Sequence, residues 1–218
     1  MKYILSPLLF ENISDIEPLA KDILEYDGIN FLFGKAKVGK TALVYKLMHW
    51  WLVQEKLETP YFITRKKMSS YQYWDSKFCQ LHIPVSTFLL FNGIKRINYA
   101  STKNTNDPAK IILLALLEEE IKKTSNYLII IEDWYGILSD SNSAYTRLLL
   151  LQLNTLRIEN KAKVLFTGRS KRKIERVMEI VKTEQQEKFE YRYLRLERPA
   201  YIEDEIKEFG ECRVWMGE

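Results

Sequence analysis

The stretch "FLFGKAKVGKTALV", residues 31–44, joins a short apolar run to two glycines, a lysine and a threonine. Its middle part, "GKAKVGKT", matches the pattern G-x-x-x-x-G-K-[ST] of a phosphate-binding loop. The apolar run before the loop predicts a strand. The residues from Lys40 onward predict a helix, because one broad face carries Leu43, Leu47, Trp50 and Trp51. A strand that leads through such a loop into a helix is the arrangement that confirms this pattern.

The residue types in the loop suit the binding of a triphosphate. Gly34 and Gly39 let backbone N–H groups curl around phosphate oxygens, and the helix N-terminus adds partial positive charge. Lys40 is expected to reach the β and γ phosphates, and Thr41 to offer a hydroxyl to Mg²⁺. The alternative is a glycine-containing turn before an ordinary helix. We expect ATP and Mg²⁺, with the nucleotide held by Gly34, Lys35, Ala36, Lys37, Val38, Gly39, Lys40, Thr41 and Ala42.

A second apolar run, "YLIIIEDW" at residues 127–134, ends in two acids. One carboxylate at such a strand end can hold a Mg²⁺-bound water, and the other can orient or deprotonate an attacking water. Because neighbours on a strand point to opposite faces, only one of Glu132 and Asp133 can face the phosphates while both keep strand geometry. We expect Asp133, just past the strand, to serve the metal with Thr41, with Glu132 a near equal, and Lys40 to act with both acids in catalysis. The alternative is that these acids merely end a strand at the surface.

The whole chain alternates short apolar runs with longer segments of helical periodicity, which predicts an α/β fold. Nearly uniform apolar strands suit a parallel sheet buried on both faces, as in a three-layer sandwich. The last two strands are expected to form an antiparallel hairpin at one edge. Strands are predicted at 29–33, 60–64, 86–91, 127–132, 163–167, 189–196 and 211–215, and helices at 14–26, from 40, and at 69–80, 108–123 and 143–160. We expect residues 1–27 to form a helical lead-in and 28–218 a single domain.

Composition limits the class of protein. With 218 residues, 46% of them hydrophobic, the chain can bury one substantial core. No apolar run approaches the roughly 18 residues of a membrane span, and the start has no cleavage site of a signal peptide, so we expect a cytoplasmic protein with no membrane contact. Cys79 and Cys212 lack the spacing of a zinc site or a disulfide framework, and His49 and His82 have no neighbouring ligands. We therefore expect no structural metal.

The loop near residue 34, the acids near 132 and the later strand "KVLFTGR" together make residues 28–216 resemble the RecA-like P-loop ATPases. The chain is most similar to the compact RadA, RadB and KaiC-type members, which consist of little more than the ATPase core. The resemblance implies a mostly parallel sheet in which the strand 163–167 lies between the strands of the loop and the acids. It also implies that Thr167 or Arg169 lies near the γ phosphate as a sensor.

Members of this family commonly assemble into rings or filaments, with ATP between subunits and a basic finger reaching across. The resemblance therefore implies a homo-oligomer or a complex of paralogues. Candidates for the finger lie in "YRYLRLERP", and the alternative is a set of exposed positions on an edge strand. These candidates are Arg192, Arg195 and Arg198.

Two departures from the family pattern concern catalysis. Family members usually place a catalytic glutamate just after the strand that follows the loop helix, but "YFITRKKMSS" offers Arg65, Lys66 and Lys67 there. The loop also has Val38 where relatives prefer a small residue. If neither acid of the 127–134 stretch takes over as base, ATP would turn over slowly and act as a switch or assembly ligand.

The net charge of +4 is mild and alone does not indicate nucleic acid, but the basic residues are concentrated. "GRSKRKIER", residues 168–176, follows the central strand, where RecA-like proteins often have a DNA-contacting loop. Salt-sensitive, sequence-independent phosphate contacts are expected there. In the polar connector 93–106, Tyr99 could stack on a base. The alternative is a solvated helix face, in which Glu175 and Glu179 pair with the candidates for DNA contact, Lys171, Arg172, Lys173 and Arg176.

Three function classes remain. The first is a DNA-associated RecA-like ATPase of recombination, replication or repair. The second is an ATP-gated regulatory or assembly module that acts through a protein partner. The third, a small-molecule kinase, is disfavoured because no compact lid insertion is evident in the sequence.

Overall fold

The computed structural model describes most of the predicted α/β core. The described residues are 2–5, 16–54, 61–64, 95–98, 107–118, 128–134, 144–169, 175, 178, 189–197 and 212–216. The strands are β1 (Lys2–Leu5), β2 (Ile29–Phe33), β3 (Tyr61–Thr64), β4 (Lys95–Asn98), β5 (Leu128–Glu132), β6 (Lys163–Gly168), β7 (Tyr191–Glu197) and β8 (Cys212–Met216). The helices in these ranges are α1 (Glu17–Glu25), α2 (Lys40–Gln54), α5 (Pro108–Glu118) and α7 (Ala144–Asn160).

All the described strands form one sheet in the order β1-β8-β7-β2-β6-β5-β3-β4. Strands β7, β2, β6, β5, β3 and β4 run parallel to one another. Strand β8 is antiparallel to β7 and to β1. The predicted parallel core and the antiparallel pair β7–β8 are therefore confirmed. The strand β6 lies between β2 and β5, as the family resemblance implies.

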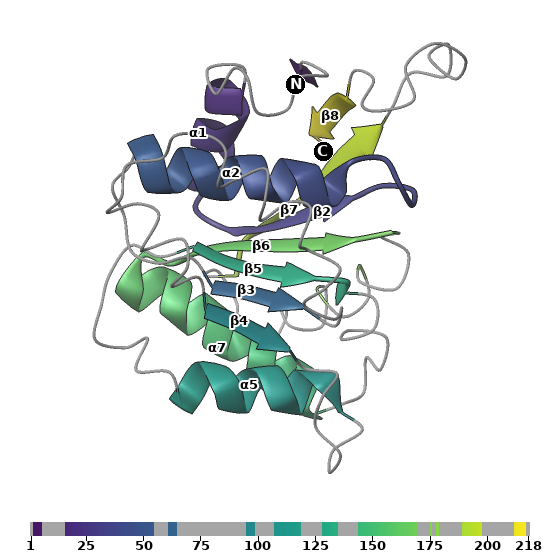
Figure 1. Ribbon diagram of the computed structural model, residues 1–218. Coiled ribbons are helices and arrows are strands. Elements are labelled where there is room, and N and C mark those ends of the chain that lie inside the picture. Colours follow the sequence, from purple (N-terminus) through teal and green to yellow (C-terminus); the bar gives the residue numbers. More distant parts are fainter. Residues whose placement is uncertain are drawn as a thin grey trace.

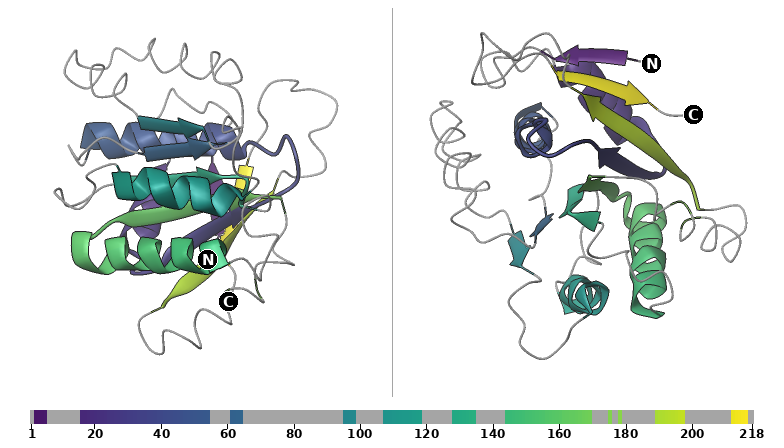
Figure 2. Two further views of the ribbon diagram at one scale, coloured as in Figure 1. Left: turned by 90° about the horizontal axis from the view of Figure 1, so that it is seen from below. Right: turned by 90° about the vertical axis from the view of Figure 1, so that its right-hand side faces the viewer.

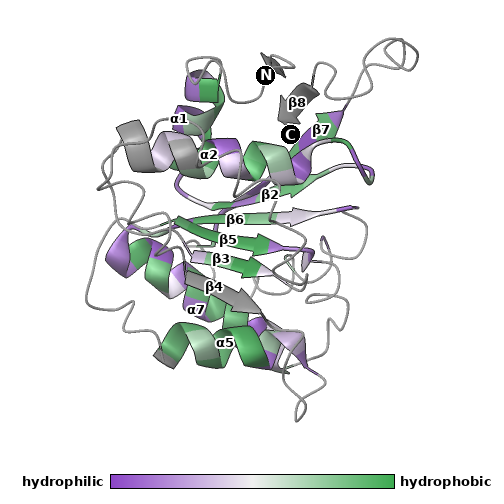
Figure 3. Ribbon diagram, viewed as in Figure 1, coloured by the Kyte–Doolittle hydropathy of each residue, from purple (hydrophilic) through white to green (hydrophobic). Residues whose placement is uncertain are grey.

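Helices cover both faces of the sheet, which makes three layers. Figures 1 and 2 show α1 and α2 on one side and α5 and α7 on the other. Along β5, Leu128 and Ile130 belong to the apolar core under α1 and α2, whereas Ile129 and Ile131 belong to the core under α5 and α7. Figure 3 shows β5 hydrophobic along most of its length and hydrophilic at its carboxyl end. Burial on both faces explains why the central strands read as continuous apolar runs.

Two edge strands were not expected from the sequence. β4 lies inside the predicted polar connector 93–106, and its residues "KRIN" include only one large apolar side chain. β1 lies inside the predicted helical lead-in and pairs with β8. The predicted strand 86–91 and helix 69–80 lie outside the described residues. Among the helices that are described, none is long and apolar enough to cross a membrane.

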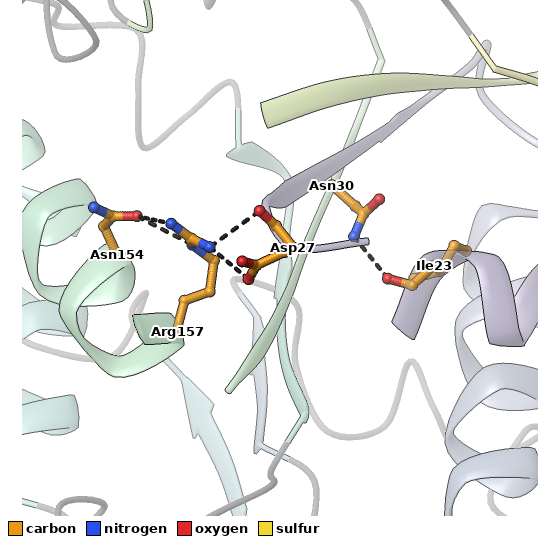
Figure 4. A network of polar contacts seen from close by, with 5 residues as sticks. All are labelled: Ile23, Asp27, Asn30, Asn154 and Arg157. Carbon is orange, nitrogen blue, oxygen red and sulfur yellow. Dashed lines mark hydrogen bonds and ion pairs between the residues drawn. The ribbon is translucent and has the colours of Figure 1, made fainter. Parts of the chain in front are cut away.

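A buried polar network ties the turn between α1 and β2 to α7 (Figure 4). Arg157 donates from Nε and Nη2 to Asn154 Oδ1 at 3.1 and 2.9 Å. Its Nη1 donates to the backbone oxygen of Asp27 at 3.0 Å and to Asp27 Oδ1 at 2.6 Å. On the other side of the turn, Asn30 Nδ2 donates to Ile23 O at 3.1 Å. The network fixes where β2 begins, and β2 leads directly into the loop.

Substitution of Arg157 by methionine is expected to lower the free energy of unfolding by about 2–3 kcal/mol, because buried donors to Asn154 and to the turn are lost. The matched variant Asp27→Ala should cost under about 1 kcal/mol, since the Asp27 side chain is 86% exposed. Urea unfolding of both variants measures the two costs. An equal loss in both would show that the ion pair, and not the buried hydrogen bonds, stabilises this junction.

Candidate nucleotide-binding site

The loop between β2 and α2 is shaped by sharp backbone turns. Lys37 has φ 63° and Gly39 has φ 103°, both in the left-handed region. A Cβ on Gly34 would lie 2.5 Å from Leu196 O and 3.0 Å from Val38 Cγ1, so the close approach of β7 leaves room only for glycine. The Gly34 N–H donates to Gly168 O at 3.2 Å, which joins the loop to the end of β6. The loop is thus anchored by both neighbouring strands.

Lys40 closes the loop from inside. Its Nζ donates to Gly34 O at 2.6 Å and to Lys35 O at 2.7 Å. The side chains of Lys35, Ala36 and Lys37 are exposed, whereas Val38 is buried in the core under α2. The residue that departs from the family pattern therefore serves as an apolar anchor. A positive amino group within a curled backbone at a helix N-terminus suits phosphate oxygens.

Glu132 lies beneath this loop at the end of β5 and is buried. Thr41 Oγ1 donates to Glu132 Oε1 at 3.2 Å, and Thr64 Oγ1, from the end of β3, donates to Glu132 Oε2 at 2.9 Å. Thr167 of β6 is buried and pairs in register with Glu132, so it lies beside Glu132 on the same face of the sheet. Three threonines on three elements thus surround one carboxylate.

The expected assignment of the metal to Asp133 stays a prediction, and the contacts of Thr41 favour its near equal, Glu132. Asp133 has φ 63°, so the chain leaves strand geometry there, and Trp134 follows it into the core under α5 and α7. Among the described residues, the carboxylate that accepts the hydrogen bond from the Thr41 hydroxyl is that of Glu132. Glutamate has the longer side chain and spans the distance from the strand end to Thr41. Glu132 is therefore the stronger candidate for the acid that faces the loop.

The oxygen atoms at this position fit Mg²⁺. The Thr41 hydroxyl and the Glu132 carboxylate lie within hydrogen-bond distance of each other, and both are oxygen ligands of the kind that Mg²⁺ prefers. Mg²⁺ usually takes its other ligands from water and substrate phosphates. In the described ranges, no group of three or more His, Cys, Asp or Glu side chains could hold an ion by itself. Thr41 and Glu132 would therefore hold Mg²⁺, directly or through its waters, together with a bound nucleotide.

Comparisons with solved structures agree with the overall fold. A KaiC-like protein of Pyrococcus horikoshii matches with a TM-score of 0.51 and 15% identity, over 87% of this chain and 79% of that chain. The flagellar accessory protein FlaH of Methanocaldococcus jannaschii matches with a TM-score of 0.52 and 14% identity, over 87% of this chain and 84% of that chain. The chain has the RecA-like P-loop ATPase fold. Comparisons with protein-family models and with curated protein sequences found no match.

The sensor candidates of the RecA-like fold lie at the carboxyl end of β6. Thr167 is buried next to Glu132, and Arg169 is exposed directly beyond the strand. Arg195 of β7 pairs in register with Phe33, the last residue before the loop. It is exposed and forms an ion pair with Glu197. Thr167 and Arg169 therefore stay candidates for the sensor, and Arg195 stays a candidate for the finger, at the edge of the sheet that carries the loop.

Arg192 lies at the opposite end of β7 and is engaged within its own chain. Its Nε donates to Asn30 Oδ1 at 2.7 Å, and its Nη2 donates to Asp22 O at 2.7 Å. The guanidinium lies 4.2 Å from the centroid of the Tyr26 ring. Burial raises the pKa of the Tyr26 phenol, and Glu190 acts in the same direction. These contacts hold α1 against the sheet, and the role of Arg192 as a finger stays a prediction.

The remaining candidates lie outside the described residues. They are Arg198, Lys171, Arg172, Lys173, Arg176 and Tyr99.

Sequence reasoning missed two features of the site. Thr64 was not singled out, although it ends a buried strand at the same edge of the sheet as Glu132. Trp134 and Gly168 were also missed: a Cβ on Gly168 would lie 2.7–2.8 Å from atoms of the buried Trp134 indole. The position of Thr64 at a strand end could have suggested its place in the site. The contact between Trp134 and Gly168 depends on the turn at Asp133, which no periodicity shows.

Proposed function

We propose that the protein binds ATP with Mg²⁺ at residues 34–42 and hydrolyses it slowly, so that the nucleotide acts mainly as a switch. The observation that carries this proposal is the environment of Glu132. Both of its carboxylate oxygens accept hydrogen bonds, from Thr41 and from Thr64. A carboxylate held in this way can orient a metal or its waters, but its oxygens are poorly available to take a proton from an attacking water.

The roles of the other residues follow from the RecA-like geometry. The backbone N–H groups of the loop and Lys40 would hold the phosphates, and Thr41 would place its hydroxyl at the metal. A bound Mg²⁺ would neutralise charge on the β and γ phosphates. Thr167, buried beside Glu132, and the exposed Arg169 would respond to the γ phosphate.

The position of the usual base supports slow turnover. After β3 the sequence continues with Arg65, Lys66 and Lys67. Such side chains are protonated near neutral pH and do not accept a proton from water. Asp133, which is partly exposed, is the other carboxylate close to the site in sequence. A slow hydrolysis step would leave the ATP-bound state long-lived.

The partner that this switch controls is inferred from charge. The basic segment 168–176 begins at Gly168, one residue after Thr167, so a change at the γ phosphate would reach that segment directly. We favour DNA as the partner, in recombination, replication or repair, with assembly into a homo-oligomer or paralogue complex in the cytoplasm. A protein partner is the second candidate, because the RecA-like neighbour FlaH is a flagellar accessory protein.

Turnover of ATP by the purified protein, with and without single-stranded and double-stranded DNA at low salt, tests this function. We expect ATP to bind, turnover to lie well below the enzyme median of about 10 s⁻¹, and DNA to be retained in a salt-sensitive manner. Lys40→Ala should abolish turnover through lost binding, and Glu132→Gln should weaken the Mg²⁺-dependent part of binding. ATP binding without DNA retention would favour the protein partner. Fast turnover lost in Glu132→Gln would instead make Glu132 the base.

A further inference from the structure

We infer that Thr64 is a positioning residue of the Mg²⁺–nucleotide site, which acts by fixing the carboxylate plane of Glu132. This inference rests on the proposed function, because it assigns a task to a residue of the same site. Thr64 is fully buried as the last residue of β3. Its bond to Glu132 Oε2, at 2.9 Å, is shorter than the 3.2 Å bond from Thr41 to Oε1.

The sheet register explains why these two side chains meet. Strands β3 and β5 are parallel neighbours, with Ile63 paired with Ile131. The next residue of each strand, Thr64 and Glu132, therefore lies side by side on the face that α2 covers. Phe62 and Ile130, two positions earlier on each strand, belong to the core on that face. The contact is thus built into the pairing of the two strands.

Fixing this carboxylate from both sides has a physical purpose. The terminal torsion of a glutamate is soft, so a single donor leaves its plane free to turn. Donors on both oxygens hold the plane and keep Oε1 directed at Thr41. Without the Thr64 hydroxyl, a buried oxygen loses a donor and the carboxylate plane is held less firmly toward the metal position. The loss should fall on the Mg²⁺-dependent part of nucleotide affinity, because Thr64 acts through Glu132.

The experiment compares the dissociation constant of ATP in excess Mg²⁺ with that in EDTA, for the wild-type chain and for Thr64→Val. Valine has a similar shape but no hydroxyl. We expect Thr64→Val to reduce the gain in affinity from Mg²⁺ by about tenfold and to leave the affinity in EDTA unchanged. Thr64→Ser restores the hydroxyl and should restore the gain.

A matched control separates this role from a general cost of deleting a buried hydroxyl. Thr146 of α7 is also fully buried, on the other side of the sheet. Thr146→Val should leave the ratio of the two dissociation constants unchanged, whatever it does to the melting temperature. If Thr64→Val does not fold, Thr64→Cys replaces it, since a thiol is a weak donor and should give a smaller gain from Mg²⁺ than wild type.

The outcomes distinguish the two proposals. A wild-type ratio in Thr64→Val, or in Thr64→Cys where that variant is used, overturns the role of Thr64 and leaves ATP binding intact. Equal losses of ATP affinity in Mg²⁺ and in EDTA also overturn this role, because they would mean that the substitution has a purely structural effect. Failure of the wild-type chain to bind ATP under either condition overturns the proposed function itself and this inference with it.

Discussion

Replacement of Lys40 by alanine is expected to weaken ATP binding by about a hundredfold, since a charged hydrogen bond contributes about 1.5–3 kcal/mol and each 1.4 kcal/mol is tenfold. The Lys40 amino group lies inside the curled loop, within 2.6 and 2.7 Å of the carbonyls of Gly34 and Lys35. A bound phosphate would offer it oxygens with negative charge in place of these neutral acceptors. Calorimetric titration with ATP and Mg²⁺ measures the loss.

Lys35→Ala is the matched control for this prediction. It removes the same charge from the same loop, but the Lys35 side chain is exposed, and its backbone carbonyl remains for Lys40. We expect its dissociation constant for ATP to change by less than about threefold. A loss as large as that of Lys40→Ala would mean that the loop attracts ATP by its overall charge and has no specific phosphate site at Lys40.

The centre of the fold could be predicted because its signals are local. Strands β2, β3, β5 and β6 are short apolar runs, and the loop follows a known pattern of residues. The edges could not be predicted in the same way. β1 and β4 read "KYIL" and "KRIN", which are only four residues each and begin with a charged lysine, so neither gives a clear strand signal. Pairing with a distant neighbour makes these residues strands.

The candidate site shows the same division between local and distant causes. Strand alternation predicts a single loop-facing acid, and the left-handed turn at Asp133, which no periodicity encodes, favours Glu132 for that place. Gly34 was predicted for its phosphate contacts. Its second requirement comes from a strand far along the chain, because a Cβ at this position would lie 2.5 Å from Leu196 O. The contact of Thr64 with Glu132 could not be predicted for the same reason, because only the β3–β5 register brings the two residues together.

Gly168→Ala is expected to lower the free energy of unfolding by about 2–3 kcal/mol, the upper part of the range for overpacking a core. The new Cβ would lie 2.7–2.8 Å from the Trp134 indole. That ring is fully buried and meets Phe31 edge-on with centroids 5.1 Å apart. Phe31 in turn stacks on Phe166 with ring centroids 5.0 Å apart, so a shift of the indole toward Phe31 would disturb packed rings.

The effect of Gly168→Ala should also reach the nucleotide. Gly168 O accepts the N–H of Gly34, the first residue of the loop, so a displaced β6 end would disturb the phosphate site. Among variants that remain folded at the assay temperature, ATP affinity should therefore fall in Gly168→Ala and not in Arg157→Met. The Arg157 network lies at the opposite ends of the strands and is expected to change stability alone.

A double-mutant cycle identifies Trp134 as the cause. Trp134→Leu by itself costs stability by leaving a cavity, but it also removes the ring atoms that the new Cβ would meet. In the Trp134→Leu background, Gly168→Ala should cost at least about 1 kcal/mol less than in the wild-type chain. Urea unfolding of the four proteins gives this coupling energy. Strictly additive costs would show that the backbone conformation at position 168, and not the close packing of Trp134, requires glycine there. The indole would then have no part in linking the end of β5 to the loop.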